Sequence, residues 1–506
     1  MAIQINQIKG DIVELIFNPK EDNLSIGENL SLREKRTEQG IIVQVVEFRT
    51  VSYPSLLMEQ LRMTLAGEPF FPLPLLQFAE KEFHEMRNLN IAIAKIHKLT
   101  GSPWDGWNGW IPARDVVVER TNDEEVFLNC IPSNGNMLYL GRTMNDEPFY
   151  IEGQALEKVN IITGVKGSGK SHLAKVLLLQ LIERGAPCIV FDINREYINL
   201  PRHEIDNKTG KTLQRGIIHL QAGSNLKLSA YQFGLQPLLT MLNKFGLPEI
   251  SSLYFESRMA RLFEEIDVRQ KMGKNAPFIG IEQLIQMADA YEFAPDNDRI
   301  NGAIRSRLNA LRNTNLFASE PNESVSLHKY YGLIRDGGAL VIDISGLSNQ
   351  ARSGFVQAVI EIIKEICFNE IAAGTERFPF LFFEEAHLYV SRNSIDYIVN
   401  RSRHIGMTCF FVTNMITGLD EAVLRQADNL FLLNLPFEDD VRHISKSAIT
   451  DMETMSAFAR RLRNYHALVI GNATRNYPLI VKVDPLEGIN TAGETKYFFK
   501  NVMSNE

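Results

Sequence analysis

Eight residues near the first third of the chain have the types and spacing of a phosphate-binding loop: Gly164-Val165-Lys166-Gly167-Ser168-Gly169-Lys170-Ser171. The apolar run at 159–163 predicts a buried strand before them, and the Leu-rich run at 173–183 predicts a helix after them. In this context backbone N–H groups and the positive end of the helix cradle phosphate oxygens. We therefore predict a nucleotide site in which Lys170 reaches the β- and γ-phosphates and the Ser171 hydroxyl binds Mg²⁺. The next residue, His172, is counted with the cofactor-binding residues.

A second cluster of reactive groups follows another apolar run. Residues 378–390 read F-P-F-L-F-F-E-E-A-H-L-Y-V, so a predicted buried strand ends in Glu384 and Glu385. In P-loop enzymes such a strand carries the Walker B carboxylates, of which one holds Mg²⁺ and the next polarises the attacking water. We assign Glu384 to the metal and Glu385 to the water. The metal-side residue is usually Asp, so the reverse assignment stays open, as does a pair of merely solvated carboxylates.

Composition sets the limits of the prediction. The 506 residues exceed a single core, so two or three domains are expected. No apolar run is long enough to cross a membrane, the first residues lack the pattern of a signal peptide, and the four cysteines lie far apart, which together predict a cytoplasmic protein. The net charge of −8 argues against a broad basic nucleic-acid surface, although it leaves room for a narrow basic channel.

Patterning divides the chain into parts. β-Branched runs at 10–17 and 41–50 predict a small N-terminal β-barrel, residues 55–100 read as helical, and short runs at 116–118, 125–128 and 136–140 predict strands that complete a first domain at 1–150. Trp104, Trp107 and Trp110 share a glycine-containing loop, which is either a contact surface for a partner or a loop pinned by its own aromatic rings.

Residues 151–485 alternate strand and helix patterns. This predicts an α/β core with a mostly parallel sheet, interrupted by a helical insertion at about 225–325 and followed by a C-terminal tail at 486–506. The expected strands lie at 160–163, 187–193, 339–344, 378–383, 408–413, 429–433 and 467–470.

Taken together, these features resemble HerA, the hexameric translocase of the HerA–FtsK P-loop superfamily. The resemblance rests on the two motifs, on F-D-I-N-R-E-Y at 191–197, on N-R-S-R-H-I-G at 400–406, and on H-A-L-V-I-G-N-A-T-R-N-Y-P-L-I-V-K-V at 466–483. It implies a RecA-like core that uses ATP and Mg²⁺. It also places Asp192, Glu196 and Tyr197 beside the nucleotide.

The resemblance extends to two further catalytic groups. Asn414 stands where a polar residue, most often Gln, contacts the γ-phosphate or its water. Arg403 matches the candidate arginine finger that reaches a neighbouring subunit's nucleotide, although Ser402 replaces the first glycine of that stretch. Arg401 and Arg425 are rivals for the same role, and an ordinary salt bridge is the alternative for each.

The resemblance implies a homo-oligomer, with a hexamer expected, that hydrolyses ATP to move on double-stranded DNA and acts with a separate nuclease or NAD-consuming effector, in anti-phage defence or DNA end processing. The 1–150 domain is the expected docking surface for that partner. The rival interpretation is a nucleotide-gated scaffold that organises the effector without translocation. A metabolic NTPase or kinase is disfavoured because the sequence shows no pattern for a pocket that would bind an acceptor substrate. Candidate DNA contacts, which could equally be solvated charges, are Lys208, Lys211, Arg215, Arg269, Lys271 and Lys274.

Overall fold

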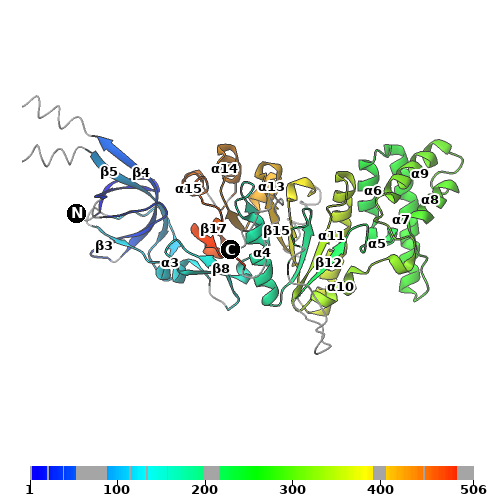
Figure 1. Cartoon of the computed structure of the whole chain (residues 1–506), viewed down its shortest axis with the longest axis horizontal. Coiled ribbons are helices and arrows are strands. Elements are labelled where there is room, and N and C mark those ends of the chain that lie inside the picture. Colours follow the sequence, from blue (N-terminus) through cyan, green and yellow to red (C-terminus); the bar gives the residue numbers. More distant parts are fainter. Residues whose placement is uncertain are drawn as a thin grey trace, which may run out of the picture.

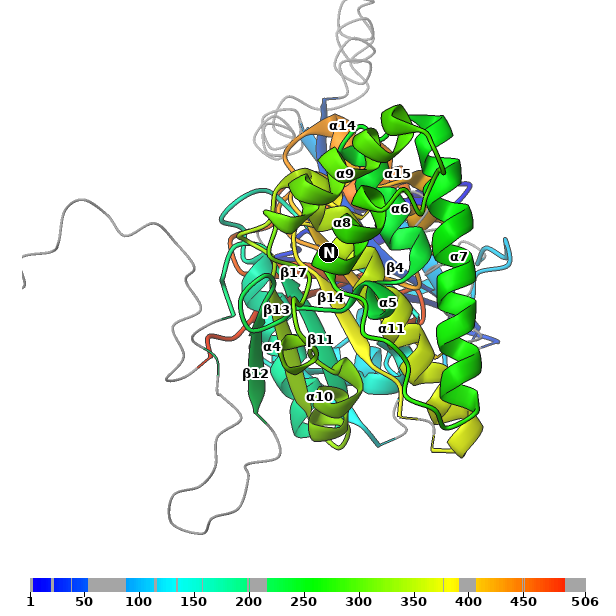
Figure 2. The ribbon, with the colours of Figure 1, turned by 90° about the vertical axis from the view of Figure 1, so that its right-hand side faces the viewer.

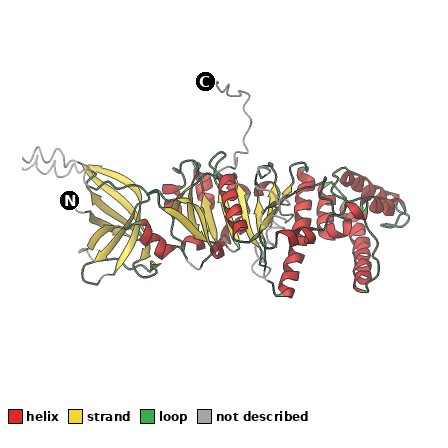
Figure 3. Ribbon diagram, turned by 60° about the horizontal axis from the view of Figure 1, so that its bottom comes forward, coloured by secondary structure: helices red, strands yellow, loops and turns green. Residues whose placement is uncertain are grey.

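The molecule is elongated, with a curled sheet at one end, an α/β layer in the middle and a group of helices at the other end (Figure 1; Figure 3). It is a computed structural model. It describes residues 3–19, 22–37, 39–52, 88–112, 116–132, 135–156, 158–197, 200, 216–375, 377–390, 406–447, 449 and 451–486. None of the helices in these ranges has the length and apolar character needed to span a bilayer.

The N-terminal part is an antiparallel sheet whose curl fits the predicted small barrel (Figure 1). Its strands lie in the order β1-β2-β5-β4-β3-β7, and the short β6 pairs with β5. The bounds are β1 Gln4–Lys9, β2 Ile12–Phe17, β3 Asn29–Glu34, β4 Gly40–Ser52, β5 Asn88–Leu99, β6 Asp105–Gly106 and β7 Val116–Arg120. The barrel therefore continues well past residue 50, where the first expected strands end.

Strand β5 corrects the expectation of helix across 55–100. Residues 88–99 form one strand between β2 and β4, while residues 53–87 lie outside the described residues. The run Ile91-Ala92-Ile93-Ala94 alternates with period two. Ala92 and Ala94 join the barrel core, whereas Ile91 and Ile93 join the main core of the α/β part. Because both faces of the strand are buried, its apolar residues are nearly continuous, and such a run also contains the spacings of three and four residues that predicted a helix.

The one other difference in this region is local, and the tryptophan loop follows one of its two expected readings. Residues 125–128, expected as a strand, belong to helix α3 (Asp123–Cys130), which begins where the Asn122 side chain accepts a hydrogen bond from the Glu125 backbone. The tryptophan loop is pinned by its rings: Trp104 is buried near Tyr477, and the Trp107 indole donates to the Trp110 carbonyl. The loop thus has a packing role within this chain.

The central layer is an eleven-stranded sheet in the order β12-β13-β11-β14-β15-β10-β16-β17-β18-β8-β9. The first seven strands are parallel and the remaining pairs are antiparallel, which confirms the predicted α/β core with a mostly parallel sheet. The bounds are β8 Met137–Arg142, β9 Pro148–Glu152, β10 Val159–Thr163, β11 Pro187–Asp192, β12 Ile217–Gln221, β13 Gly338–Asp343, β14 Phe380–Phe383, β15 Thr408–Thr413, β16 Asn429–Leu432, β17 His466–Gly471 and β18 Leu479–Val483.

Helices cover both faces of this sheet, so alternate residues of each strand enter different cores. Helix α4 (Lys170–Glu183) packs on one face with Phe382 and Phe410, whose rings stack 4.4 Å apart. Helix α11 (Asn349–Ala373) packs on the other face with Phe383 and Phe411, whose rings stack 5.3 Å apart. The Phe-rich strands are consequently buried on both sides, as parallel strands between helices must be.

Strands β8 and β9 belong to this layer rather than to the first domain, because β8 pairs with β18 at the sheet's antiparallel side. The expectation that residues 136–140 complete the N-terminal part is thereby corrected.

Strand β12, which no pattern indicated, is the parallel edge strand beside β13. Between β12 and β13 the chain forms helices α5 Ala230–Phe233, α6 Leu235–Lys244, α7 Glu249–Lys271, α8 Ile281–Asp289, α9 Asp298–Arg312 and α10 Leu327–Ile334. Figure 2 shows the end of the molecule formed by these helices, where α5 and α6 pack against α11.

The barrel is joined to the α/β layer through polar side chains of β5. The Lys95 ammonium, nearly buried, pairs with Asp11 at 3.1 Å, with Asp451 at 2.8 Å and with Glu453 at 3.2 Å. The Lys98 ammonium donates to the Arg475 carbonyl at 2.6 Å. Asp451 and Glu453 lie at the start of helix α15 (Met452–Phe458), so this contact connects two parts that are far apart in sequence.

His97 lies between these lysines and makes the junction sensitive to acid. Burial lowers its pKa to about 4, and its ring lies edge-on to Tyr477 at 5.3 Å. The unfolded chain binds a proton near pH 6.5 and the folded chain does not, so stability should fall by about 3 kcal/mol as pH drops from about 6.5 to about 4. We expect His97→Phe to remove this part of the acid sensitivity, measured as denaturant midpoints of both proteins at pH 7.5 and pH 5. Parallel losses in the two proteins would contradict the assignment to His97.

Candidate active site

The loop after β10 has the backbone geometry of a phosphate cradle. Gly164 has φ 157°, and a Cβ there would lie 2.8 Å from both the Leu433 Cβ and the Ser168 Oγ. Gly169 has φ 110° and directly precedes Lys170, the first residue of α4. Only glycine fits these two positions: at Gly164 a side chain would clash with its neighbours, and at Gly169 the backbone is left-handed. The predicted strand, loop and helix are therefore present in the order that phosphate binding requires.

The Lys170 ammonium lies within this loop. Its Nζ donates to the Val165 carbonyl at 3.0 Å, and the side chain is almost fully buried. Burial lowers the pKa of Lys170, while Glu385, Glu384 and Glu196 act in the opposite direction. Within the described residues, the buried ammonium bonds only to the loop's own backbone, so it is well suited to exchange that bond for a phosphate oxygen.

The Ser171 hydroxyl joins the phosphate loop to the predicted Walker B strand. It donates to Oε1 of Glu384 at 2.8 Å, and the Tyr197 hydroxyl donates to Oε2 at 3.0 Å. Glu384 is fully buried at the end of β14, and burial, reinforced by the charge of Glu196, raises its pKa to about 7. An oxygen pair made of a hydroxyl and a carboxylate matches the oxygen ligands that Mg²⁺ prefers. The residues therefore fit the metal predicted for this position.

Glu385 projects from a strained turn toward the neighbouring strand. Its backbone is left-handed, with φ 49° and ψ 48°. Oε1 accepts a hydrogen bond from Asn414 at 3.2 Å, whereas the buried Oε2 accepts none from the described residues. Nδ1 of His387 lies 3.5 Å from Oε2 and 2.9 Å from the Thr413 hydroxyl. One carboxylate oxygen is thus held by Asn414, while the other lies buried beside the His387 ring.

The sheet order explains how these side chains meet. Strand β15 lies between the Walker B strand β14 and the phosphate-loop strand β10. Asn414 directly follows β15, so its amide reaches Glu385 across the carboxyl edge of the sheet. The structure brings Lys170, Ser171, Glu384, Glu385 and Asn414 to one edge. Their catalytic roles remain predictions.

Asp192 and Glu196 make contacts that fix the segment after β11, next to the candidate site. The Asp192 carboxylate accepts backbone hydrogen bonds from residues 194, 196 and 197, which fixes the turn after β11. Glu196 lies 3.6 Å from the ammonium of Lys175, a buried residue of α4. In this structure the D-x-x-x-E-Y motif directs Tyr197 onto Glu384. Lys175, which sequence reasoning missed, could have been found as the one lysine within a Leu-rich helical run.

Other predicted residues are placed apart from this edge or cannot be placed. The His172 side chain contacts the Asp484 carbonyl at 2.9 Å, so only its backbone faces the loop as a candidate for phosphate binding. Arg425, on helix α13 (Glu421–Arg425), is exposed and pairs with Glu421. Arg401 and Arg403 lie outside the described residues, as do Lys208, Lys211 and Arg215. Arg269, Lys271 and Lys274 are exposed at the end of α7, in the helical insertion.

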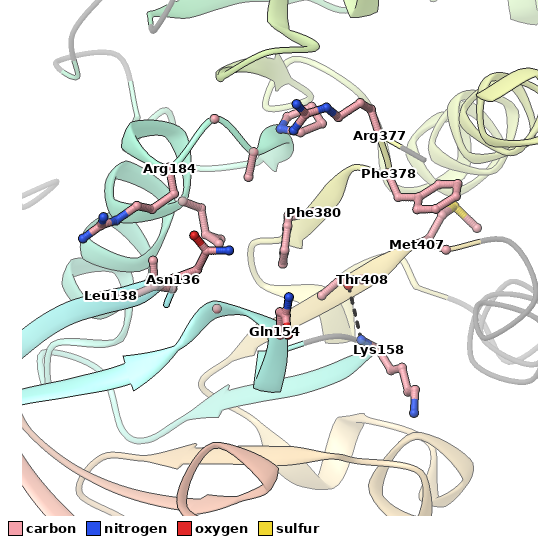
Figure 4. Close-up of a pocket in the computed structure, with 16 residues that line it drawn as sticks. Asn136, Leu138, Gln154, Lys158, Arg184, Arg377, Phe378, Phe380, Met407 and Thr408 are labelled. Carbon is pink, nitrogen blue, oxygen red and sulfur yellow. Dashed lines mark hydrogen bonds between the residues drawn. The ribbon is translucent and has the colours of Figure 1, made fainter. Parts of the chain in front are cut away.

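A cavity of about 450 Å³ lies at the opposite edge of the sheet (Figure 4). It is lined by the residues that begin the parallel strands, including Phe380, Thr408 and Lys158, whose backbone N–H donates to the Thr408 hydroxyl at 3.2 Å. The cavity contains none of the predicted site residues. Because ligands of parallel α/β sheets bind at the carboxyl ends of the strands, the phosphate loop rather than this cavity is the candidate active site.

Comparison with known proteins agrees with this geometry. Residues 138–363 match the family model described as "Helicase HerA, central domain", which begins at β8 and includes the phosphate loop. The chain is a HerA-like P-loop ATPase. It is 22% identical over 401 residues to the DNA double-strand break repair helicase HerA of Sulfolobus acidocaldarius, an alignment that covers 74% of each chain. It is 23% identical over 396 residues to the protein of the same name from Sulfurisphaera tokodaii, again covering 74% of each.

A solved structure supports the fold independently. VirB4 of Thermoanaerobacter pseudethanolicus superposes with a TM-score of 0.52 and 16% identity, covering 71% of the HerA-like chain and 99% of that chain. At this identity the likeness concerns the fold, and it confirms the predicted P-loop ATPase architecture.

Substitution of the two adjacent carboxylates should have different effects on nucleotide binding and on turnover. We expect Glu385→Gln to bind Mg-ATP like the wild type and to lose turnover by about 100-fold or more, because an amide cannot accept the water's proton. Glu384→Gln should instead weaken the Mg²⁺ dependence of binding, since it removes a charged metal ligand. Nucleotide affinity at several Mg²⁺ concentrations and steady-state phosphate release measure the two effects. The reverse pattern would exchange the roles of the two residues.

Proposed function

We propose that this ATPase is a ring-forming motor that couples ATP hydrolysis to movement on double-stranded DNA. The observation that supports the hydrolytic part is the hydrogen bond from Ser171 to Glu384, next to the Glu385 carboxylate that Asn414 holds in place. The DNA part is supported by the relatives, which are named DNA double-strand break repair helicases.

The residues present can divide the work of phosphoryl transfer. Lys170 and the loop backbone would hold the phosphates of ATP, while Ser171 and Glu384 would hold Mg²⁺, which neutralises charge on the β- and γ-phosphates. Glu384 must lose its proton to act as a ligand, so its raised pKa, about 7, couples metal binding to proton release. Glu385, fixed by Asn414, would orient the water and accept its proton. Asp192 and Glu196 would keep Tyr197 on Glu384.

This set of residues lacks a cation opposite Lys170 to neutralise the transition state. We propose that Arg403 of a neighbouring subunit supplies it, which would make hydrolysis depend on assembly. A head-to-tail interface that closes after six copies would place every Arg403 at a neighbour's nucleotide. The described rival, Arg425, is already paired with Glu421.

The motor would work with a separate effector such as a nuclease or an NAD-consuming enzyme. Within the described ranges no group of three or more His, Cys, Asp and Glu side chains is arranged to hold a metal. The barrel is the proposed docking surface, because it lies at the far end of the molecule from the helical insertion (Figure 1).

The acidic net charge of −8 favours a second candidate function, a nucleotide-gated scaffold that organises the effector without moving along DNA.

DNA-stimulated turnover distinguishes motor from scaffold. For the motor we expect duplex DNA to raise ATP hydrolysis several-fold, and the stimulation to weaken as salt rises, because phosphate contacts release counterions. Phosphate release should be measured with and without duplex over a salt series, with Glu385→Gln as the inactive control. Turnover that is identical with and without DNA, in a protein that still forms rings, would favour the scaffold.

Subunit mixing tests the arginine. We expect Arg403→Ala to bind ATP without hydrolysing it, and excess Lys170→Ala subunits to restore part of the activity, because mixed interfaces combine an intact loop with an intact arginine. Arg425→Ala is the matched control and should keep most of its turnover. Failure of rescue in rings shown to be mixed would mean that Arg403 acts within its own subunit or only structurally.

A further inference from the structure

One exposed aromatic side chain borders the phosphate loop and has no part in the mechanism above. Tyr465 directly precedes β17, and half of its surface is exposed (50%). Its backbone is left-handed, with φ 62°, an uncommon conformation for a bulky residue. Such strain persists only where the surroundings enforce it, and it is found most often where a side chain must be presented to a ligand.

The surroundings that enforce it are the phosphate loop and the last strand. The Tyr465 N–H donates to the Ser168 carbonyl at 2.8 Å, and the Tyr465 carbonyl accepts from Val483 at 2.8 Å. A Cβ on Gly169 would lie 3.0 Å from the Tyr465 ring, so the ring rests directly on the loop backbone. The ring of His172 meets it edge-on, with centroids 5.4 Å apart. The position of the Tyr465 ring is therefore fixed to the loop itself.

The ring stands on the side of the loop opposite the catalytic carboxylates. Strand β10 has β15 and then β14 on one side, where Glu384 and Glu385 meet Ser171 and Asn414. On its other side lie β16 and then β17, which starts at Tyr465. With the terminal phosphate facing the carboxylates, a nucleoside that continues away from them along the loop lies on the side of β16 and β17.

We propose that Tyr465 is the base-binding residue of this site and stacks its exposed face on the purine of the nucleoside triphosphate. The inference rests on the phosphate loop as the nucleotide site and adds the subsite for the base. The His172 ring meets the Tyr465 ring at an interplanar angle of 88°, and its Nε2 lies 2.9 Å from the Asp484 carbonyl. The free part of the ring is available to a flat, apolar partner, and every base offers such a face.

The subsite is tested by comparing ATP with inorganic tripolyphosphate, which has the same phosphates and no base. Tyr465→Ala should raise the dissociation constant of ATP about 5- to 100-fold, the range that loss of one stacked aromatic produces, and leave tripolyphosphate binding unchanged. Tyr465→Phe should behave like the wild type. Binding is measured by calorimetry for ATP and by displacement of a fluorescent nucleotide for tripolyphosphate, in the full-length protein.

Tyr291→Ala is the matched control, since Tyr291 is also a partly exposed tyrosine with left-handed backbone, φ 59°, but lies in the helical insertion. It should bind both ligands normally. Unchanged ATP affinity in Tyr465→Ala would overturn the proposal, and so would an equal loss for ATP and tripolyphosphate, because the ring would then only shape the loop. Lys170→Ala separates the two levels of inference: it should weaken both ligands, and if it weakens neither, the phosphate loop rather than the base subsite is misassigned.

Discussion

The hydrogen bond between the Ser171 hydroxyl and the Glu384 carboxylate is the contact on which the active site depends. It joins the first turn of α4 to the end of β14, two elements more than two hundred residues apart in sequence. Glu384 is buried, so its charge is costly unless it is hydrogen-bonded or bound to a cation. Two hydroxyl groups, those of Ser171 and Tyr197, donate hydrogen bonds to this carboxylate, and its pKa is raised because burial disfavours the charged form. A metal that displaces the proton would convert the same carboxylate into a ligand.

Much of the surrounding structure keeps that contact in place. The parallel strands are buried on both faces, so side chains of alternate residues lock β14 and β15 into register against α4 and α11. Asp192 fixes the turn that delivers Tyr197, and Lys175 neutralises Glu196 behind it. The polar side chains around the site therefore form a continuous support, and removing any one of them would leave a buried group without its partner.

The barrel is connected to this core by apolar side chains of β4 and β5 and by polar contacts, of which the ion pairs of Lys95 are the most buried. Burial alone would lower the pKa of Lys95, yet hydrogen bonds and charge from Asp451 and Asp11 raise it above its ordinary value. A buried ion pair of this kind contributes to specific positioning more than to net stability. The antiparallel strands β17, β18, β8 and β9 form the side of the sheet nearest the barrel. Tyr465, which precedes β17, hydrogen-bonds to the phosphate loop. The phosphate loop and the barrel thus contact the same group of strands.

The sequence by itself determined the local chemistry. Glycines at 164 and 169, the Lys-Ser pair after them and the carboxylates after an apolar run predict the nucleotide site, because these features depend on spacing within a short segment. It also predicted the mostly parallel α/β core and the helices within 225–325. Only the tertiary structure decided what depends on distant partners: that residues 88–99 form a strand, that β8 joins the large sheet, and that Asn414 bonds Glu385. Continuous apolar runs do not distinguish a strand buried on both faces from a helix, and no spacing within a segment reveals which strand becomes its neighbour.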